Sequence, residues 1–449
     1  MKNRIIVALL FLFSFCHSQE HFSGISTSNR VGILNGVTNP AEFSNLSKKF
    51  EVNIYGISFD VANNKIGFSD LTSDTNLEEL IFRGSEPVNM RINGQIIGPS
   101  FAMKFMKWGF GITTKANFKF DIVDVNPTIG NAIFDNNLPI NITQLSTADN
   151  QRLAGVSYGE VGFSAARTVF ENDKHRIDAG ITLKFLFPGS YSNFGLSELD
   201  GTITQVGGSA FLTTNSPATL NIAYSGSLAD SFSNFDDYTK SVFGGLNGVA
   251  TDIGITYQWK DGKSKYKIKG GASIRNIGSL NFKDSNNYNT SYTLDIQPTP
   301  QNPSGLDLGL FDNVNNLRNV EDILIANGYL TQEPNQTSFR VNLPTMFALY
   351  GDFKIVPKVY ITGYLQQKMN QDSADDQITS VNIISVTPRI NLGFFESYIP
   401  ISNNDISGTN IGIGFRLGGF YLGSNSIFSA LTSDSKQADF YTGFRFALL

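Results

Sequence analysis

The sequence predicts an all-β fold, namely a transmembrane antiparallel β-barrel. Apolar and polar side chains alternate strictly over residues 110–122, as in a strand whose successive side chains point to opposite faces. This stretch is longer than the usual strand of about five or six residues and suits the roughly ten residues of a tilted transmembrane strand. The alternation recurs along the chain. No run of about 18 apolar residues follows the N-terminus, which excludes spanning helices.

The composition favours one barrel over several soluble domains. A soluble chain of 449 residues would suggest about three domains, but no break in composition divides this one. Charged residues make up only 16%, whereas the chain holds 42 glycines and 37 phenylalanines. Apolar residues dispersed over alternating strands are typical of barrels, which hydropathy analysis therefore misses.

The first 18 residues predict a secretory signal peptide. Lys2 and Arg4 form its positive region, residues 5–15 its apolar core, and cleavage is expected near Ser18. We therefore expect an exported protein of the cell outer membrane.

Removal of this signal changes both the charge and the cysteine content. Cys16 is the only cysteine, and Phe15 stands where a lipoprotein signal needs a small residue, so neither disulfides nor lipidation are expected. Without the signal, 32 basic and 39 acidic residues remain, a net charge of −7. That balance argues against a nucleic-acid partner, which calls for a basic face.

Residues 19–49 predict a separate N-terminal segment. It is polar and rich in glycine and asparagine, and it contains Asn39, Pro40 and Ala41 shortly before the first strand. That strand is expected over residues 50–61, within a barrel that spans residues 50–449. The apolar residues of this strand alternate with polar ones, and the alternation shifts by one position at Gly56. This shift predicts a β-bulge there.

Connection lengths also alternate along the chain. Long polar loops are expected near residues 62–98, 123–152, 228–248, 277–337 and 369–379. Short turns are expected near residues 106–108, 171–174, 214–218, 260–264 and 357–358. Short periplasmic turns and long external loops are typical of an outer-membrane barrel. The alternating segments number sixteen, and we expect 14 or 16 strands.

A loop helix and two tryptophans beside turns are also predicted. A helix is expected over residues 314–326, with Leu317, Val320, Ile323 and Leu324 on one side, either packing under its loop or forming a ligand lid. Trp108 and Trp259 lie beside short turns, where an interfacial aromatic girdle would place them.

The residues offer no enzymatic, metal or cofactor chemistry. Residues 155–159 match the G-x-S-x-G pattern but open a strand, whereas a nucleophile elbow needs a strand-to-helix turn. The histidines of the mature chain, His21 and His175, lie far apart in sequence and are interpreted as solvated.

Charged side chains leave two alternatives open. Asp372, Asp375 and Asp376 either bridge lipopolysaccharide through a divalent cation or belong to a solvated loop. The Lys, Arg and Asp side chains on the inward face of the strands either line a polar channel or neutralise one another across a plugged lumen.

Several segments resemble a family of uncharacterised outer-membrane β-barrels from the bacterial phylum that uses type 9 secretion. The terminal stretches 412–424 and 434–441 carry the resemblance most specifically. Shorter similar segments lie at residues 98–101, 252–254, 275–278 and 343–345.

Asn39-Pro40-Ala41 is similar to the motif of the long-chain fatty-acid transporter superfamily. In that superfamily the motif belongs to a hatch inside a fourteen-stranded barrel, so the resemblance implies that these three residues lie in a luminal plug. An ordinary turn is the alternative, because Asn-Pro favours turns. The chain ends in Leu449, without the terminal aromatic residue common in such barrels.

These resemblances imply a channel for hydrophobic or amphipathic small molecules. The alternative is a non-transporting binding or accessory subunit of a secretion or surface-assembly complex. Expected partners are membrane lipids and lipopolysaccharide, together with a hydrophobic small molecule or secretion-system proteins.

Overall fold

A computed structural model describes most of the chain. The described residues are 21–28, 32–72, 76–134, 142–147, 149–226, 244–261, 266–312, 314, 316–432 and 434–448. The predicted signal peptide and its cleavage site lie outside this part of the chain.

Fourteen strand positions within the described residues close into one antiparallel barrel. Of the two strand numbers expected, 14 is correct, and the count of sixteen candidate segments was too high because some of them lie outside the barrel. β2 with β3, β16 with β17, β20 with β21, and β22 with β23 each occupy one position. The barrel strands are β1 (Phe50–Asn63), β2 (Val88–Ile97), β3 (Ser100–Phe105), β4 (Trp108–Val125), β6 (Gln151–Glu171), β7 (His175–Ser197), β11 (Gly248–Trp259), β12 (Ile268–Lys283), β16 (Ser338–Asn342), β17 (Met346–Val356), β18 (Val359–Lys368), β19 (Ile383–Asn391), β20 (Phe395–Tyr398), β21 (Ile401–Asn404), β22 (Gly408–Ile411), β23 (Ile413–Leu417), β24 (Phe420–Ser424) and β25 (Gln437–Leu448).

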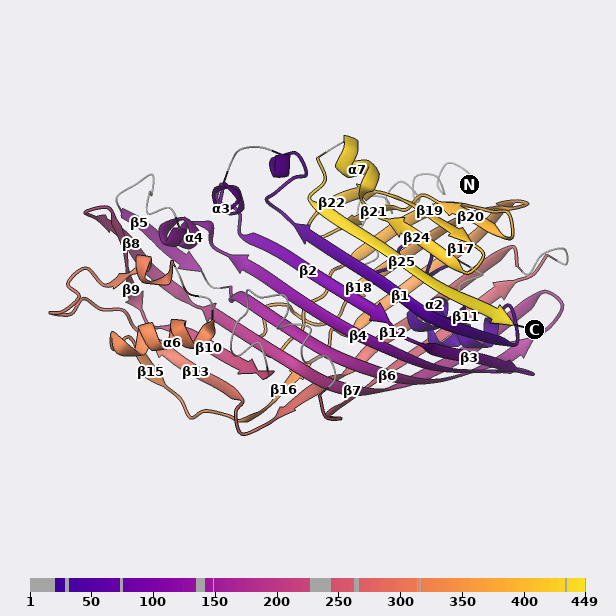
Figure 1. Cartoon of the computed structure of the whole chain (residues 1–449), viewed down its shortest axis with the longest axis horizontal. Coiled ribbons are helices and arrows are strands. Elements are labelled where there is room, and N and C mark those ends of the chain that lie inside the picture. The colour runs from indigo at the N-terminus through magenta and orange to yellow at the C-terminus, as the bar shows by residue number, and fades with distance from the viewer. Residues whose placement is uncertain are drawn as a thin grey trace, which may run out of the picture.

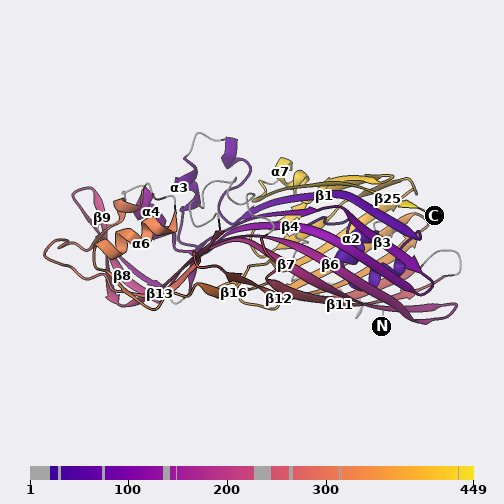
Figure 2. The same ribbon diagram turned by 60° about the horizontal axis from the view of Figure 1, so that its bottom comes forward.

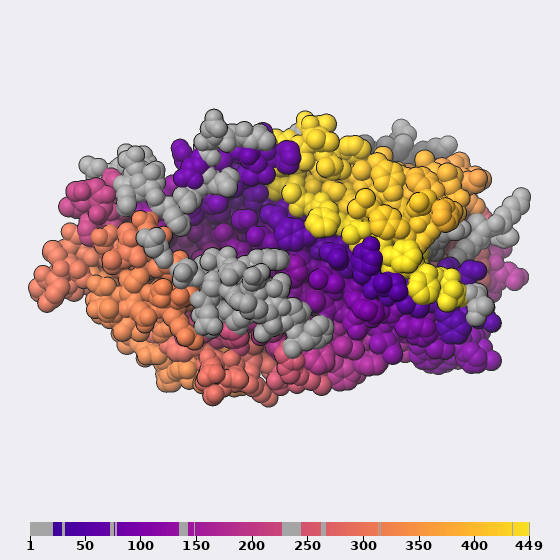
Figure 3. All heavy atoms as spheres, in the orientation of Figure 1, coloured from indigo at the N-terminus to yellow at the C-terminus, as the bar shows by residue number. Residues whose placement is uncertain are grey.

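The first and last strands close the barrel. β1 pairs with β25 from Phe50 opposite Leu448 to Ala62 opposite Gln437, and the two ends of the colour scale meet there in Figure 3. Closure leaves no open sheet edge, so the backbone groups of the strands are paired with one another.

The two faces of the barrel differ as the alternation predicts. On β4, Phe110 and Ile112 are exposed outward, whereas Lys115, Asn117 and Asp121 are buried inside. Trp108 and Trp259 are exposed beside short turns, as the girdle prediction requires. In the part of the chain that the structure describes, no helix is long and apolar enough to cross a membrane.

The parity change of the first strand is confirmed. Ile54 and then Ile57 are exposed, so the outward file shifts by one residue between them. The register with β25 shifts between Asn53 and Tyr55, slightly before the predicted position at Gly56.

Short turns gather at one end of the barrel. Those near residues 106–107, 172–174 and 357–358 were predicted, and most of the turn predicted at 260–264 lies outside the described residues, whereas 392–394 and 418–419 were missed. A short connection also lies within the predicted 214–218, but it joins β9 (Ser209–Ser216) to β10 (Ala218–Ser225) at the opposite end, so its predicted place among the short turns of the barrel is wrong. The predicted loop 62–98 is also too long, because β1 and β2 extend into it.

Beyond the barrel lies a folded head (Figures 1 and 2). β7 pairs with β11 as far as Phe185, whereas its residues 191–197 pair with β10. β10 in turn pairs with β13 (Tyr288–Leu294), and β13 pairs with β15 (Leu330–Gln332). A second sheet consists of β5 (Ile142–Thr147), β8 (Leu199–Val206), β9 and β14 (Leu306–Asp307).

Helices complete the head and the loops. α6 (Leu317–Ala326) confirms the predicted helix and packs Leu317 and Leu324 into the apolar core of the head. The remaining short helices outside the barrel are η2 (Asp70–Thr72), α3 (Leu77–Ile81), α4 (Pro127–Phe134), η4 (Leu308–Phe311) and α7 (Ile427–Thr432).

An arginine on the outward face should destabilise the protein in a lipid bilayer. Ile253 is exposed on β11, six residues before Trp259, or roughly 15 Å along the axis for strands tilted about 40°. We expect Ile253→Arg to lower the free energy of unfolding in vesicles by about 2–4 kcal/mol. Ile142→Arg, on an exposed position of the head, is the control and should change it by less than about 0.5 kcal/mol. Equal effects of the two variants would contradict a lipid-facing position for Ile253.

Candidate functional site

Residues 21–28 and 32–46 of the N-terminal segment are nearly all buried, and they pack against barrel strands. The segment forms α2 (Gly32–Thr38) and the short helix η1 (Pro40–Asn45), whose six residues are all buried. η1 contacts β3, β4, β6, β7 and β11, and α2 lies among the barrel strands in both ribbon views (Figures 1 and 2). The structure therefore brings Asn39, Pro40 and Ala41 together within the lumen.

Asn39 connects this segment to the barrel wall. It is fully buried, and its Oδ1 accepts a hydrogen bond of 3.0 Å from the backbone N–H of Ala41, which caps η1. Its Nδ2 donates to the carbonyl oxygens of Ile255 and Ala272, at 3.0 and 3.2 Å. Those two residues pair across β11 and β12. The side chain thus has both a local role, as in a turn, and a role in holding the segment to the wall.

Glycines in the wall leave room for the segment. Gly180 and Gly254 are paired on β7 and β11. A Cβ on Gly254 would lie 2.0 Å from Asn39 Oδ1, and one on Gly180 would lie 2.5 Å from the carbonyl carbon of Pro40. On β4, a Cβ on Gly109 would lie 2.0 Å from the carbonyl oxygen of Phe43. We call Gly109, Gly180 and Gly254 the glycine seat.

Buried polar contacts hold the rest of η1. The Glu42 carboxylate accepts from Lys269 Nζ at 2.6 Å and from the Tyr350 hydroxyl. Arg176 donates to the carbonyl oxygen of Ser44 at 2.9 Å. A charge buried in this way is costly to leave unpaired, so these contacts favour one position of the segment.

Apolar residues of the segment pack against the wall. Phe22 and Leu34 cluster with Tyr398, Tyr421 and Tyr441 near the end with the short turns, and Ile33 packs with Phe43 in a second cluster. Val37 packs against the second cluster, and Val31 lies outside the described residues.

The loop between β18 and β19 also enters the lumen. Asp372 accepts from Lys368 at 2.7 Å and Arg91 at 3.4 Å, while Asn193 donates to Asp375 at 3.0 Å. Fully buried Arg152 donates to backbone carbonyls of Asp372, Asp375 and Gln377. The solvated-loop interpretation is therefore wrong for Asp372 and Asp375, because partners on the barrel wall bind them, whereas Asp376 is exposed.

The described residues of this loop do not form a metal site. Among the described residues, no group of three or more His, Cys, Asp or Glu side chains could hold a metal ion. Asp376 instead accepts a hydrogen bond from Asn342 at 3.0 Å.

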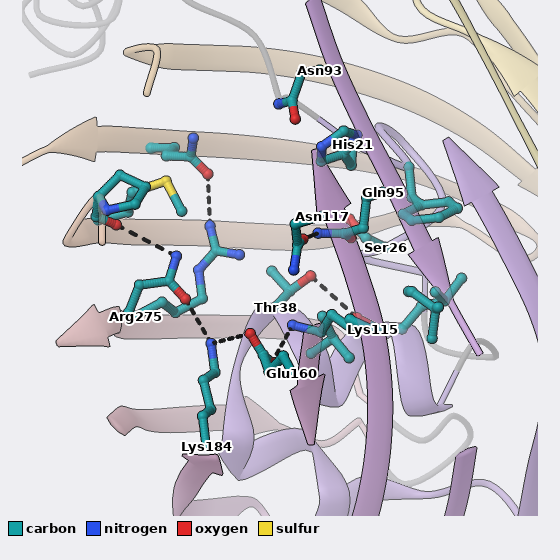
Figure 4. A pocket seen from close by; sticks show the side chains of 18 of the residues that line it. His21, Ser26, Thr38, Asn93, Gln95, Lys115, Asn117, Glu160, Lys184 and Arg275 are labelled. Carbon is teal, nitrogen blue, oxygen red and sulfur yellow. Dashed lines mark hydrogen bonds and ion pairs between the residues drawn. The ribbon is translucent and has the colours of Figure 1, made fainter. Parts of the chain in front are cut away.

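A small chamber lies between the N-terminal segment and the barrel wall (Figure 4). About 80 Å³ of it is open to the centres of water-sized molecules. Its apolar lining consists of Phe22, Leu34 and Val37 from the segment and of Ile97, Pro344 and Met346 from the rest of the chain. The polar and charged residues of that lining are His21, Ser26, Thr38, Asn93, Gln95, Lys115, Asn117, Lys119, Glu160, Lys184, Arg275, Asn276 and Gln366, together with Tyr158 and Tyr364.

Ion pairs cross the wall of the chamber. Lys115 lies 2.8 Å from Glu160, which is 3.7 Å from Lys184, and Lys184 is 2.8 Å from Asp252. Arg275 donates to Gln366 Oε1 at 2.6 Å. Glu160 and Asp252 thus compensate part of the positive charge of the chamber wall, as the second of the two alternatives expects.

The remaining candidate residues are structural. His21 lines the chamber and lies 2.9 Å from the Ser58 hydroxyl, so its interpretation as solvated is wrong. His175 lies beside a short turn, 2.8 Å from the Tyr257 hydroxyl. Residues 155–159 lie within β6, so the strand interpretation of the G-x-S-x-G pattern is confirmed.

A side chain in the glycine seat should displace the N-terminal segment. We expect Gly254→Val to expose a cysteine placed at buried Ser44, because the new side chain overlaps Asn39. In a Cys16→Ser, Ser44→Cys background, maleimide labelling should accelerate about tenfold, as for a loss of roughly 1.4 kcal/mol of protection. Gly363→Val is the control, since no heavy atom lies within 4 Å of its added Cβ. Slow labelling of both variants would contradict the claim that the N-terminal segment needs the glycine seat for its position.

No curated protein sequence matches this chain. The Ralstonia pickettii toluene transporter TbuX is 10% identical, with 94% of this chain and 95% of that chain covered and a TM-score of 0.42.

Two Pseudomonas structures give comparable values. A Pseudomonas aeruginosa FadL homologue is 9% identical over 96% of this chain and 98% of its own, with a TM-score of 0.41. The Pseudomonas putida toluene transporter TodX is 9% identical over 96% and 93%, with a TM-score of 0.40. These likenesses are too low to assign a substrate to this chain.

The family model gives a firmer result. A family of unknown function, DUF5723, matches residues 40–425, from the second residue of the Asn39-Pro40-Ala41 motif to the end of β24. The link to type 9 secretion stays a prediction. Because the match covers most of the sequence, the chain belongs to the DUF5723 family.

Proposed function

We propose that this protein is an outer-membrane channel for amphipathic small molecules, with residues 21–45 as a hatch. The observation that carries the proposal is the chamber, whose lining combines apolar side chains, among them Phe22 and Leu34 of the N-terminal segment, with lysine and arginine side chains of the barrel wall. An amphipathic molecule needs both kinds of surface at once.

The shape of the barrel supports the location and the orientation. An apolar outer face, two tryptophans near the short turns and a folded head at the opposite end fit an outer-membrane barrel with its short turns in the periplasm. The N-terminal segment then closes the periplasmic half, and residues 369–382 close the external half.

The charges of the chamber favour an anionic head group. Lys115, Lys119, Lys184 and Arg275 line it with Glu160 as the one acidic residue in the described lining. Asp252 compensates Lys184 from behind, so an excess of positive charge remains. A carboxylate or sulfonate would interact favourably with that excess, and a quaternary ammonium group would not.

Transport requires the hatch or the loop to move. The chamber of about 80 Å³ holds only several water molecules. We therefore interpret the structure as the closed state of the channel, with Asn39 and Glu42 as the main polar attachments of the hatch.

A non-transporting binding subunit is the second candidate function. The extent of buried pairing favours it, because removing one partner of a buried ion pair typically costs about 3–5 kcal/mol, and opening would disrupt several such contacts. In that case secretion-system proteins would bind the outside of a permanently closed barrel.

Liposome uptake distinguishes the two functions. We expect vesicles containing the mature protein to admit a labelled medium-chain alkyl carboxylate, and Asn39→Ala to raise the rate about tenfold by loosening the hatch, equivalent to about 1.4 kcal/mol. The matched alkyl trimethylammonium salt should enter more slowly. Arg275→Gln should reduce this preference, because it removes one chamber charge.

Protein-free vesicles and vesicles with Lys283→Glu, altered at the end of β12 next to the head and away from the chamber, are the controls. The channel proposal would be contradicted if wild type and Asn39→Ala both gave the same uptake as protein-free vesicles. That outcome would favour the binding subunit.

A further inference from the structure

A wide vestibule opens at the end of the barrel that bears the short turns. Its volume is about 1030 Å³, far larger than the central chamber. It is lined by the exit of the N-terminal segment, by the ends of β3 and β25, by the start of β18, and by the turns at 392–394 and 418–419. The lining residues are Leu46, Ser47, Lys48, Lys104, Tyr360, Gly393, Phe394, Arg416, Gly418, Gly419, Phe444, Arg445, Phe446 and Ala447.

This lining is cationic. Lys48, Lys104, Arg416 and Arg445 contribute four positive charges, and the described lining includes no Asp or Glu. Arg416 is 3.1 Å from Glu396 and Arg445 is 3.0 Å from Glu51, so two of the four charges are compensated by buried carboxylates.

The other two charges are available to a ligand. Lys48 is exposed and Lys104 is half-buried. Neither ammonium group makes a hydrogen bond or an ion pair within the described part of the chain, and both line the same cavity. Two cations without an ion-pair partner among the described residues, in one concave and partly apolar site, attract anions more strongly than the same charges on a flat surface.

Size and surface chemistry select the kind of anion. An inorganic anion would occupy a small part of about 1030 Å³ and leave Phe394 and Phe444, both exposed, without a contact. An acidic peptide supplies carboxylates for the lysines and carbon surface for the phenylalanines. We propose that the vestibule binds an acidic peptide segment of another protein.

The position of the vestibule couples such a partner to the hatch. Leu46, Ser47 and Lys48 line it, and they directly follow η1. A bound peptide would therefore touch the chain between the hatch and β1. That the partner is periplasmic rests on the proposed orientation, whereas peptide binding itself does not.

Fluorescence anisotropy tests the proposal on the full mature chain in detergent. The probe is a labelled hexapeptide of alternating aspartate and glutamate. We expect saturable binding that weakens with salt, and an affinity about tenfold lower for Lys48→Glu/Lys104→Glu, because like charges then meet in the site. A hexapeptide of lysine should not bind the wild type.

Lys283→Glu, a charge reversal at the last residue of β12 next to the head, is the matched control and should retain binding. Heat-modifiable migration on gels checks that each variant has folded. Equal loss in the control and the double variant would overturn the proposal. So would displacement of the peptide by equimolar inorganic phosphate, or stronger binding to phosphatidylglycerol vesicles than to the peptide. None of these outcomes depends on the uptake of a small molecule, so the channel and the peptide site can fail separately.

Discussion

Backbone hydrogen bonding imposes the constraint on which the rest of this structure depends. A strand exposed to lipid must find a partner on each side, because no water is present to satisfy its N–H and C=O groups. The pairing of β1 with β25 meets that requirement over the length of both strands. Closure then creates an interior, and every charged side chain that alternates inward must be paired within it.

Ion pairs between wall residues, and contacts of the wall with the N-terminal segment, meet this second requirement. Lys115, Glu160, Lys184 and Asp252 form a continuous series of ion pairs, and Glu42 of the N-terminal segment pairs with Lys269 of the wall. The segment fits because glycines replace side chains where it approaches closest. The lumen is thus filled by the same polar groups that barrel closure forces inside.

Two separate regions follow from this filling. The chamber lies between the N-terminal segment and the barrel wall, and its lining is both apolar and cationic. The vestibule lies beyond the segment, at the short-turn end, and is cationic with exposed phenylalanines. The segment borders both, which makes it the element through which a ligand on one side and a partner on the other would influence each other.

The sequence by itself determined the barrel, its two faces and the inward position of Gly180, Gly254 and the charged file, because a strand's alternation is a local property of period two. It also pointed to Asn39, Pro40 and Ala41. Only the tertiary structure decided that inward glycines meet Asn39 and Pro40, that Asp372 and Asp375 fold back onto Arg91 and Asn193, and that β7 leaves the barrel for the head. These contacts join residues up to about three hundred positions apart, and no local pattern encodes such partners.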